Sequence, residues 1–178
     1  TFLPGSEIAQ LSGEGTTFTF EGGATINGDV SGDGNVYSFS TKAGDVTLIA
    51  GDLDLGTGSS TSGGTPGSPV TVQGDGVVGP GSNRGGNFRI QGNLFLEGSF
   101  GPGNSPGVIS VGGDYVSGDP LAGDDTIPDA LFEVTFGKAN PVAAVDYDQF
   151  NVGGNVDGST VVYLERWDSD ASTPLGNL

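Results

Sequence analysis

Residues 48–55 read Leu-Ile-Ala-Gly-Asp-Leu-Asp-Leu: a short apolar run, then Gly51-Asp52, then a second alternating run. Short runs of alternating apolar residues are typical of β-strands, and Gly next to Asp is typical of a tight turn between strands. The stretch therefore predicts two short strands joined by a corner. Alternation predicts that Leu48 and Ala50 share one face before this corner and that Leu53 and Leu55 share one after it.

The same pattern recurs along the chain. Gly followed by Asp or Asn stands between apolar runs at Gly28, Gly51, Gly74, Gly92, Gly113 and Gly154. The intervals are 23, 23, 18, 21 and 41 residues, and a degenerate copy near Phe136-Gly137-Lys138 is expected to divide the last one. A period near 20 residues with short strands in each copy predicts a parallel β-solenoid, in which each copy forms one coil.

We therefore predict an all-β fold, a parallel β-helix of about six to seven coils. An antiparallel β-sandwich is the alternative, because Gly-Asp is also a hairpin signal. Residues 1–11 precede the first clear copy and are predicted as an extended N-terminal arm, residues 12–167 as one solenoid domain, and residues 168–178 as a tail. A loop rich in Gly, Ser and Thr is expected at residues 56–69, between two copies.

Composition excludes several classes of function. The 178 residues include 22 acidic and five basic side chains, which gives a net charge of −17. Such a surface repels phosphate, so neither nucleic acid nor an anionic membrane is expected as a partner. The chain has no Cys, Met or His, so thiol and imidazole chemistry and Cys/His zinc sites are excluded. No run of 18 apolar residues occurs, so no helical membrane insertion is expected.

Calcium is the candidate cofactor, because it prefers the carboxylate and amide oxygens that Asp and Asn supply at turns. The candidate ligands are Asp33, Asn35, Asp52, Asp54, Asp119, Asp124 and Asp125. Their spacing matches no calcium-binding loop motif. The alternative for each of them is a turn in which the side chain bonds the backbone.

An enzyme is not expected. Glycoside hydrolysis needs two carboxylates about 5–10 Å apart, and the tight pairs outside the corners are Asp124/Asp125 and Asp146/Asp148. A lyase acting on acidic glycans needs basic residues, of which the chain has few. A polysaccharide lyase or hydrolase is thus the least favoured alternative, and no catalytic residue is assigned.

Three segments resemble known bacterial exoproteins. They are GPGNSPGVISVGGDYVSG at 101–118, ALFEVTFG at 130–137 and DYDQFNVGGNVDGSTVVYL at 146–164. They resemble the passenger regions of autotransporters and of secreted surface proteins that carry a PEP-type sorting signal. The resemblance covers roughly residues 88–165. It implies a right-handed parallel β-helix at the surface of a Gram-negative-type bacterium, and it implies no catalytic residues.

The ends of a solenoid expose unpaired strand edges, which favour the addition of another chain. Apolar residues near the two ends are the candidate assembly interface, namely Phe2, Leu3, Ile8, Leu11 and Trp167. The arm is predicted to pair with a neighbouring copy by strand addition, which builds a head-to-tail filament. The sequence thus predicts a non-enzymatic extracellular structural protein. The alternative is an adhesin that binds surface glycans, which needs a row of exposed aromatic side chains on one face.

Overall fold

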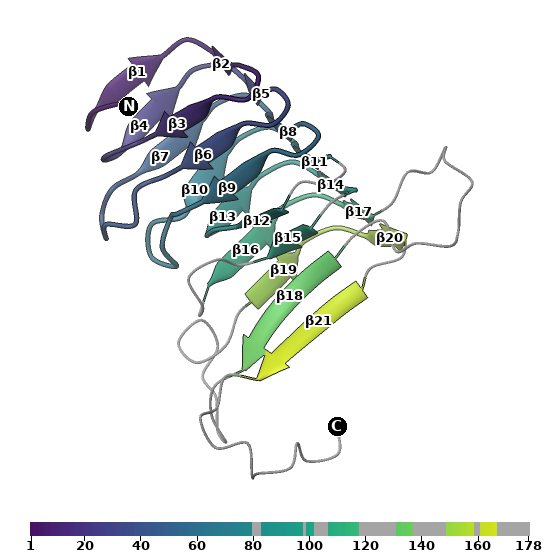
Figure 1. Cartoon of the computed structure of the whole chain (residues 1–178). Helices are drawn as coiled ribbons and strands as arrows, with labels where there is room; N and C mark the ends of the chain where they lie inside the picture. The colour runs from purple at the N-terminus through teal and green to yellow at the C-terminus, as the bar shows by residue number, and fades with distance from the viewer. Residues whose placement is uncertain are drawn as a thin grey trace.

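The computed structural model of the protein is a stack of short strands (Figure 1). It describes residues 1–79, 83–97, 99–101, 107–117, 131–136, 149–158 and 161–166, and for 83–85, 99–101, 131–136 and 161–166 it describes the backbone alone. The regular secondary structure of these residues is β-strand, and no helix occurs among them. The all-β prediction is confirmed.

Two parallel sheets of seven strands form two sides of the stack. The first contains, in spatial order, β1 (Ser6–Ile8), β4 (Ala24–Ile26), β7 (Thr47–Ile49), β10 (Val70–Val72), β13 (Phe88–Ile90), β16 (Val108–Val111) and β19 (Gln149–Val152). The second contains β2 (Leu11–Ser12), β5 (Val30–Ser31), β8 (Leu53–Leu55), β11 (Gly76–Val78), β14 (Leu94–Leu96), β17 (Tyr115–Ser117) and β20 (Val156–Gly158). Neighbours within each sheet are three strands apart in sequence, which is the topology of a solenoid.

A third side completes the coils. It consists of a sheet of β3 (Thr17–Thr19), β6 (Val36–Ser38) and β9 (Ser60–Ser62), and a sheet of β12 (Asn83–Gly85), β15 (Ser99–Gly101), β18 (Leu131–Phe136) and β21 (Val161–Arg166). Strands β9 and β12 lie side by side, so the two sheets follow one another along the stack. All pairings between these strands are parallel, which confirms the β-solenoid and excludes the antiparallel sandwich.

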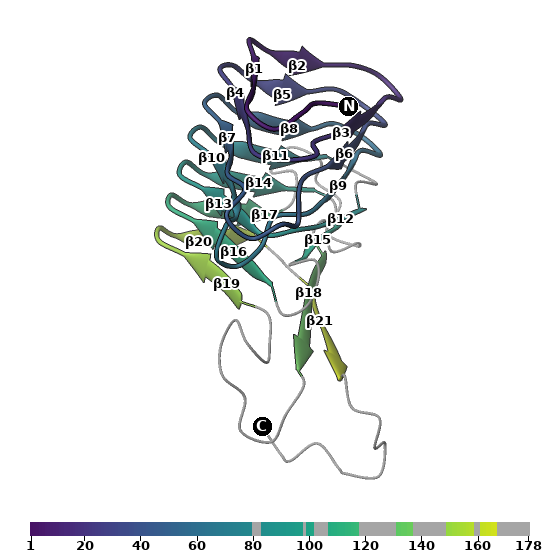
Figure 2. The ribbon, with the colours of Figure 1, turned by 90° about the vertical axis from the view of Figure 1, so that its left-hand side faces the viewer.

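The number of complete coils is slightly smaller than predicted. Strands β1 to β15 form five coils of three strands each. Strands β16, β17, β19 and β20 extend the first two sheets, while β18 and β21 run out from the stack (Figure 2). The third side continues through β18 and β21, but β18 pairs with β15 at Ser99 and Leu131 alone, so the regular three-sided coils end at β15.

No additional coil lies in the 41-residue interval. Strand β16 pairs directly with β19, and β17 pairs directly with β20. Phe136 ends β18, a strand on the third side, so the degenerate copy predicted near it is wrong; Gly137 and Lys138 lie outside the described residues. Within this interval the structure describes one further strand, β18, which lies on the third side.

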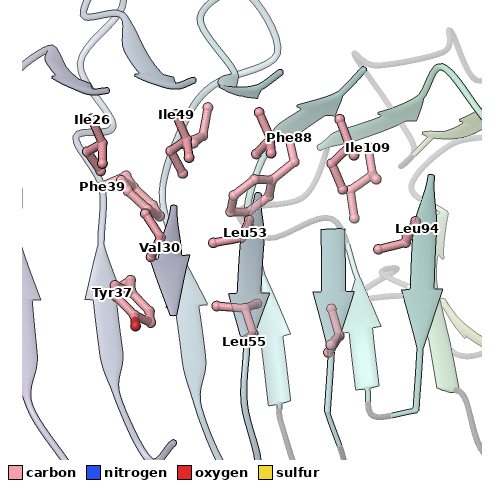
Figure 3. Packing of buried hydrophobic residues seen from close by; sticks show 14 of the residues in the cluster. Ile26, Val30, Tyr37, Phe39, Ile49, Leu53, Leu55, Phe88, Leu94 and Ile109 are labelled. Atoms are coloured by element: carbon pink, nitrogen blue, oxygen red, sulfur yellow. The ribbon is translucent and has the colours of Figure 1, made fainter. Parts of the chain in front are cut away.

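The core consists of columns of inward-facing side chains, one from each coil (Figure 3). In the first sheet Ile26 pairs with Ile49, and both are fully buried. Thr47 and Ile49 therefore face inward, whereas Leu48 and Ala50, which were predicted to share one face, are both half-buried and lie on the outer side. Leu53 and Leu55 share one face as predicted, and that face is the inner one.

Residues predicted as an arm and as a loop belong to the coils. Strand β1 lies within residues 1–11, and β2 begins at Leu11. They pair with β4 and β5, so this segment forms part of the first coil instead of an extended arm. Strand β9 lies within the predicted loop at residues 56–69 and pairs with β6. Both segments pair because the edge of the neighbouring coil supplies backbone hydrogen-bond partners.

Candidate functional site: the corner ladder and the ends of the solenoid

The repeated Gly-Asp and Gly-Asn pairs form one continuous row of hydrogen bonds along the corner between the first two sheets. The side chain of each Asp or Asn accepts a bond from the backbone N–H of its counterpart in the next coil. The bonds run from Asp52 N to Asp29 Oδ1 (3.0 Å), Asp75 N to Asp52 Oδ1 (2.8 Å), Asn93 N to Asp75 Oδ1 (2.6 Å), Asp114 N to Asn93 Oδ1 (2.9 Å) and Asn155 N to Asp114 Oδ1 (2.7 Å). We call these six residues the corner ladder.

The glycine that precedes each ladder residue is required by close approach of the backbone. A Cβ on Gly74 would overlap Asp52 Oδ1 and lie 2.8 Å from the carbonyl oxygen of Gly51. The backbone N–H of Gly74 also donates to that carbonyl, at 3.1 Å. The repeated motif is therefore explained by stacking: Gly permits the contact and Asp or Asn bonds across it.

The first coil does not take part in the corner ladder. Its corner consists of Ala9 and Gln10 between β1 and β2, whereas three residues separate β4 from β5. Both Ala9 and Gln10 are exposed. The ladder therefore begins at Asp29, and the first coil has a different corner.

The second corner contains a buried polar cluster around Asn35, whose side chain is inaccessible to solvent. Asn35 Oδ1 accepts from Thr16 N at 2.9 Å, and Asn35 Nδ2 donates to Gly13 O at 2.8 Å and to Tyr37 Oη at 3.0 Å. The backbone N–H of Asn35 donates to Ser59 Oγ at 3.1 Å. Asn35 thus bonds the coil before it and the coil after it.

The predicted calcium ligands do not converge on one point. Among the described residues no group of three or more acidic side chains is close enough to hold a metal ion. Asn35 is bonded within the buried cluster, and Asp52 belongs to the corner ladder. Asp119, Asp124 and Asp125 lie outside the described residues. Calcium binding by this set stays a prediction.

Asp33, Asp52 and Asp54 are the candidates that the fold does bring within electrostatic range. Burial raises the pKa of Asp54 above its ordinary value, and the negative charges of Asp33 and Asp52 raise it further. Asp54 pairs with Val77 on the outer face of the second sheet, so it has an apolar neighbour on that side. The ionised form of Asp54 is therefore disfavoured in the folded state.

Replacing Asp54 by Asn is expected to raise the melting temperature at pH 7. Because the folded-state pKa is raised, the folded protein binds this proton more tightly than the unfolded chain does. The charge therefore lowers stability above the folded-state pKa, and the penalty disappears as pH falls below about 4, the ordinary pKa of Asp. Thermal unfolding followed by circular dichroism at pH 7 and pH 3 checks this. A calcium site would reverse the order at pH 7 in excess calcium, since Asn is the weaker ligand.

The candidate interface residues at the N-terminal end differ in exposure. Leu11 is buried, Phe2 and Ile8 are half-buried against the core, and Leu3 is 64% exposed. Trp167 lies outside the described residues. The side chains of three of the four described candidates are thus buried or half-buried in their own chain.

The opposite end presents an uncovered core position. Val156 on β20 is the register neighbour of Tyr115 on β17. Tyr115 is 3% exposed, whereas Val156 is 68% exposed. Nothing in the sequence pattern distinguishes the two positions, because the exposure of Val156 follows from its place in the last rung of the described strands.

Aromatic side chains of the first coils lie inside the solenoid. Phe2, Phe20 and Phe39 stack with ring centroids 4.9 Å apart, and Phe18 stacks on Tyr37 at 5.3 Å. Burial raises the pKa of the Tyr37 phenol, which donates to Ser31 O at 3.1 Å. Outside this stack, Phe95 on β14 is 40% exposed. Among the described side chains it is the one large aromatic that is exposed, so no exposed aromatic row is present there.

Comparison with known proteins adds no assignment. No family model, no curated protein and no solved structure matches the chain. In the described part of the chain there is also no helix of the length and hydrophobicity that crossing a membrane requires.

Proposed function

We propose that this chain is a non-enzymatic structural protein of the bacterial cell surface, and that copies of it associate through the ends of the solenoid into filaments. The observation that carries the proposal is the uncovered core and sheet edge at Val156. An apolar side chain at a core position is 68% exposed there, on β20, which among the described strands is paired on one side only, with β17. Open sheet edges favour association with a further strand.

The polar residues of the repeat support a structural role. The corner ladder uses its side chains to bond the next coil, and the buried cluster at Asn35 uses its side chain in the same way. Such residues hold the stack together instead of facing a ligand. A catalytic role for acidic residues would need a pair that converges on one substrate atom.

A glycan-binding adhesin is the second class of function. Sugar-binding faces on solenoids need exposed aromatic side chains in a row, and Phe95 stands alone among the described side chains in this respect. This observation favours the structural role over the adhesin.

The association is expected to depend on salt and on the first corner. At a net charge of −17 the copies repel one another, and salt screens this repulsion. Sedimentation velocity over a series of protein concentrations compares about 0.15 M salt, which is physiological, with about 0.5 M. Larger species are expected at the higher salt concentration. Replacing Gln10 by Lys places a charge at the N-terminal edge and is expected to weaken association about tenfold or more, since Lys blunts sheet edges.

The matched control is Gln91→Lys. Gln91 is an exposed corner residue of an inner coil, so this variant has the same net charge but leaves both ends unchanged. Equal effects of the two substitutions would contradict association through the ends, and a wild-type protein that stays monomeric under all these conditions would contradict the proposed function itself.

A further inference from the structure

The first residues of the chain lie beside the third side of the first coil. The backbone N–H of Phe2 donates to Thr19 O at 2.7 Å, and the backbone N–H of Glu21 donates to Phe2 O at 3.0 Å. These two bonds make a parallel bridge between Phe2 and Phe20. Residues around Phe2 thus occupy the position that the third strand of a preceding coil would have.

The side chain of Phe2 closes the aromatic column at the same place. Its ring stacks on Phe20 with centroids 4.9 Å apart, and Phe20 stacks on Phe39 at the same distance. Phe20 is 2% exposed although it belongs to the first coil. Leu3, the next residue along the chain, is 64% exposed and contributes no such cover.

We infer that residues 1–3 cap the edge of the third side where β3 ends, at Thr19 and Phe20, and that β1 and β2, which among the described strands pair on one side only, are the edges to which a second copy of this chain adds. Only the addition of a second copy at β1 and β2 rests on the proposed function, because closure of the edge is a property of one chain. It reverses the expectation from the sequence, in which the arm pairs with a neighbouring copy. A neighbour that adds to β3 has to displace Phe2 first.

The closure is tested by amide hydrogen exchange. The Glu21 amide bonds Phe2 O, whereas the Phe39 amide bonds Ser62 O within the stack, at 2.9 Å. In Phe2→Ala and in a chain lacking residues 1–3, exchange at Glu21 is expected to rise about tenfold or more, with Phe39 unchanged. Leu3→Ala is the matched control and is expected to leave both amides unchanged. Unchanged exchange at Glu21 in the deletion variant would overturn the inference.

The second part is tested by association. Removing residues 1–3 frees the edge of β3, so sedimentation velocity is expected to show association at about tenfold lower concentration than for the wild type. Weaker association after the deletion would overturn the inference, because the arm would then be the adhesive segment. If wild type and deletion variant both stay monomeric, the proposed function fails, and hydrogen exchange still decides whether the edge is closed.

Discussion

Replacing Asn35 by Ala is expected to lower the free energy of unfolding by about 3–5 kcal/mol, because it removes three hydrogen bonds of a fully buried side chain and leaves a cavity. The Asn35 side chain is inaccessible to solvent and bonds Thr16 N, Gly13 O and the buried Tyr37 Oη, whereas Gly13 itself is half-buried and Thr16 exposed. Each lost hydrogen bond costs about 1 kcal/mol, more at the buried Tyr37 Oη, and the space left by the amide adds to this. Urea unfolding followed by circular dichroism measures the change.

Asn35→Asp separates hydrogen bonding from side-chain volume. At neutral pH a carboxylate oxygen replaces Nδ2 and faces Gly13 O, with which Nδ2 makes a bond of 2.8 Å. We expect Asn35→Asp to be as destabilising as the Ala variant at pH 7 and to recover stability at low pH, where the protonated acid can donate again. The exposed Asn27 provides the control, since Asn27→Ala removes the same amide from a corner surface. A loss smaller than about 1 kcal/mol for Asn35→Ala would contradict a structural role for this cluster.

Replacing Gly74 by Ala is expected to lower the free energy of unfolding by about 3 kcal/mol. The added methyl group would overlap Asp52 Oδ1 and approach the Gly51 carbonyl oxygen, so the two coils must separate locally and the ladder bond to Asp75 N is strained. Overpacking of this kind costs about 1–3 kcal/mol, and a lost hydrogen bond adds about 1 kcal/mol. In a chain of this length the melting temperature should fall by about 6–12 °C.

Gly67→Ala is the matched control for the corner glycine. A Cβ at Gly67 would have no atom within 4 Å, so this substitution removes a glycine without a clash. Its melting temperature is expected to equal that of the wild type or to exceed it slightly, since Ala restricts the unfolded chain. Equal losses for Gly67→Ala and Gly74→Ala would show that the corner glycines are not required by stacking.

The sequence was sufficient to predict the solenoid because stacking imposes the same requirement on every coil. Each ladder corner brings one backbone onto the next, which selects Gly, and leaves one backbone N–H for a side-chain acceptor, which selects Asp or Asn. A requirement repeated in this way appears as a motif. The corner predicted at Gly51-Asp52 is confirmed, since it lies between β7 and β8.

Features that occur in only one or two coils left no repeated pattern. Asn35 stacks between Thr16 and Ser59, three different residues at equivalent positions, so its acidic surroundings suggested a calcium ligand instead of a buried cluster. Alternation groups Leu48 with Ala50 but does not say which face is inward, and register with the neighbouring strands places Thr47 and Ile49 inside. In both cases the pairing of strands between neighbouring coils determines which side chain is buried. The sequence of a single coil does not contain this information.

The ends could not be predicted for the same reason. The sequence predicts that Phe2 belongs to an apolar arm. In the structure Phe2 instead bonds its own chain beside the end of β3 and stacks on Phe20. Val156 reads as a core residue, and only its place in the last rung exposes it. Exposure at the ends of a solenoid depends on the length of the stack, which the motif itself does not encode.

The orientation of the strands within assembled filaments tests the central claim most directly. Fibre diffraction from aligned assemblies of the purified protein should give a reflection at about 4.8 Å along the filament axis, because copies joined end to end continue the spacing between coils. A 4.8 Å reflection perpendicular to the axis would mean that copies associate side by side, and the absence of any assembly would mean that the ends do not associate. Either result would contradict the proposed structural role.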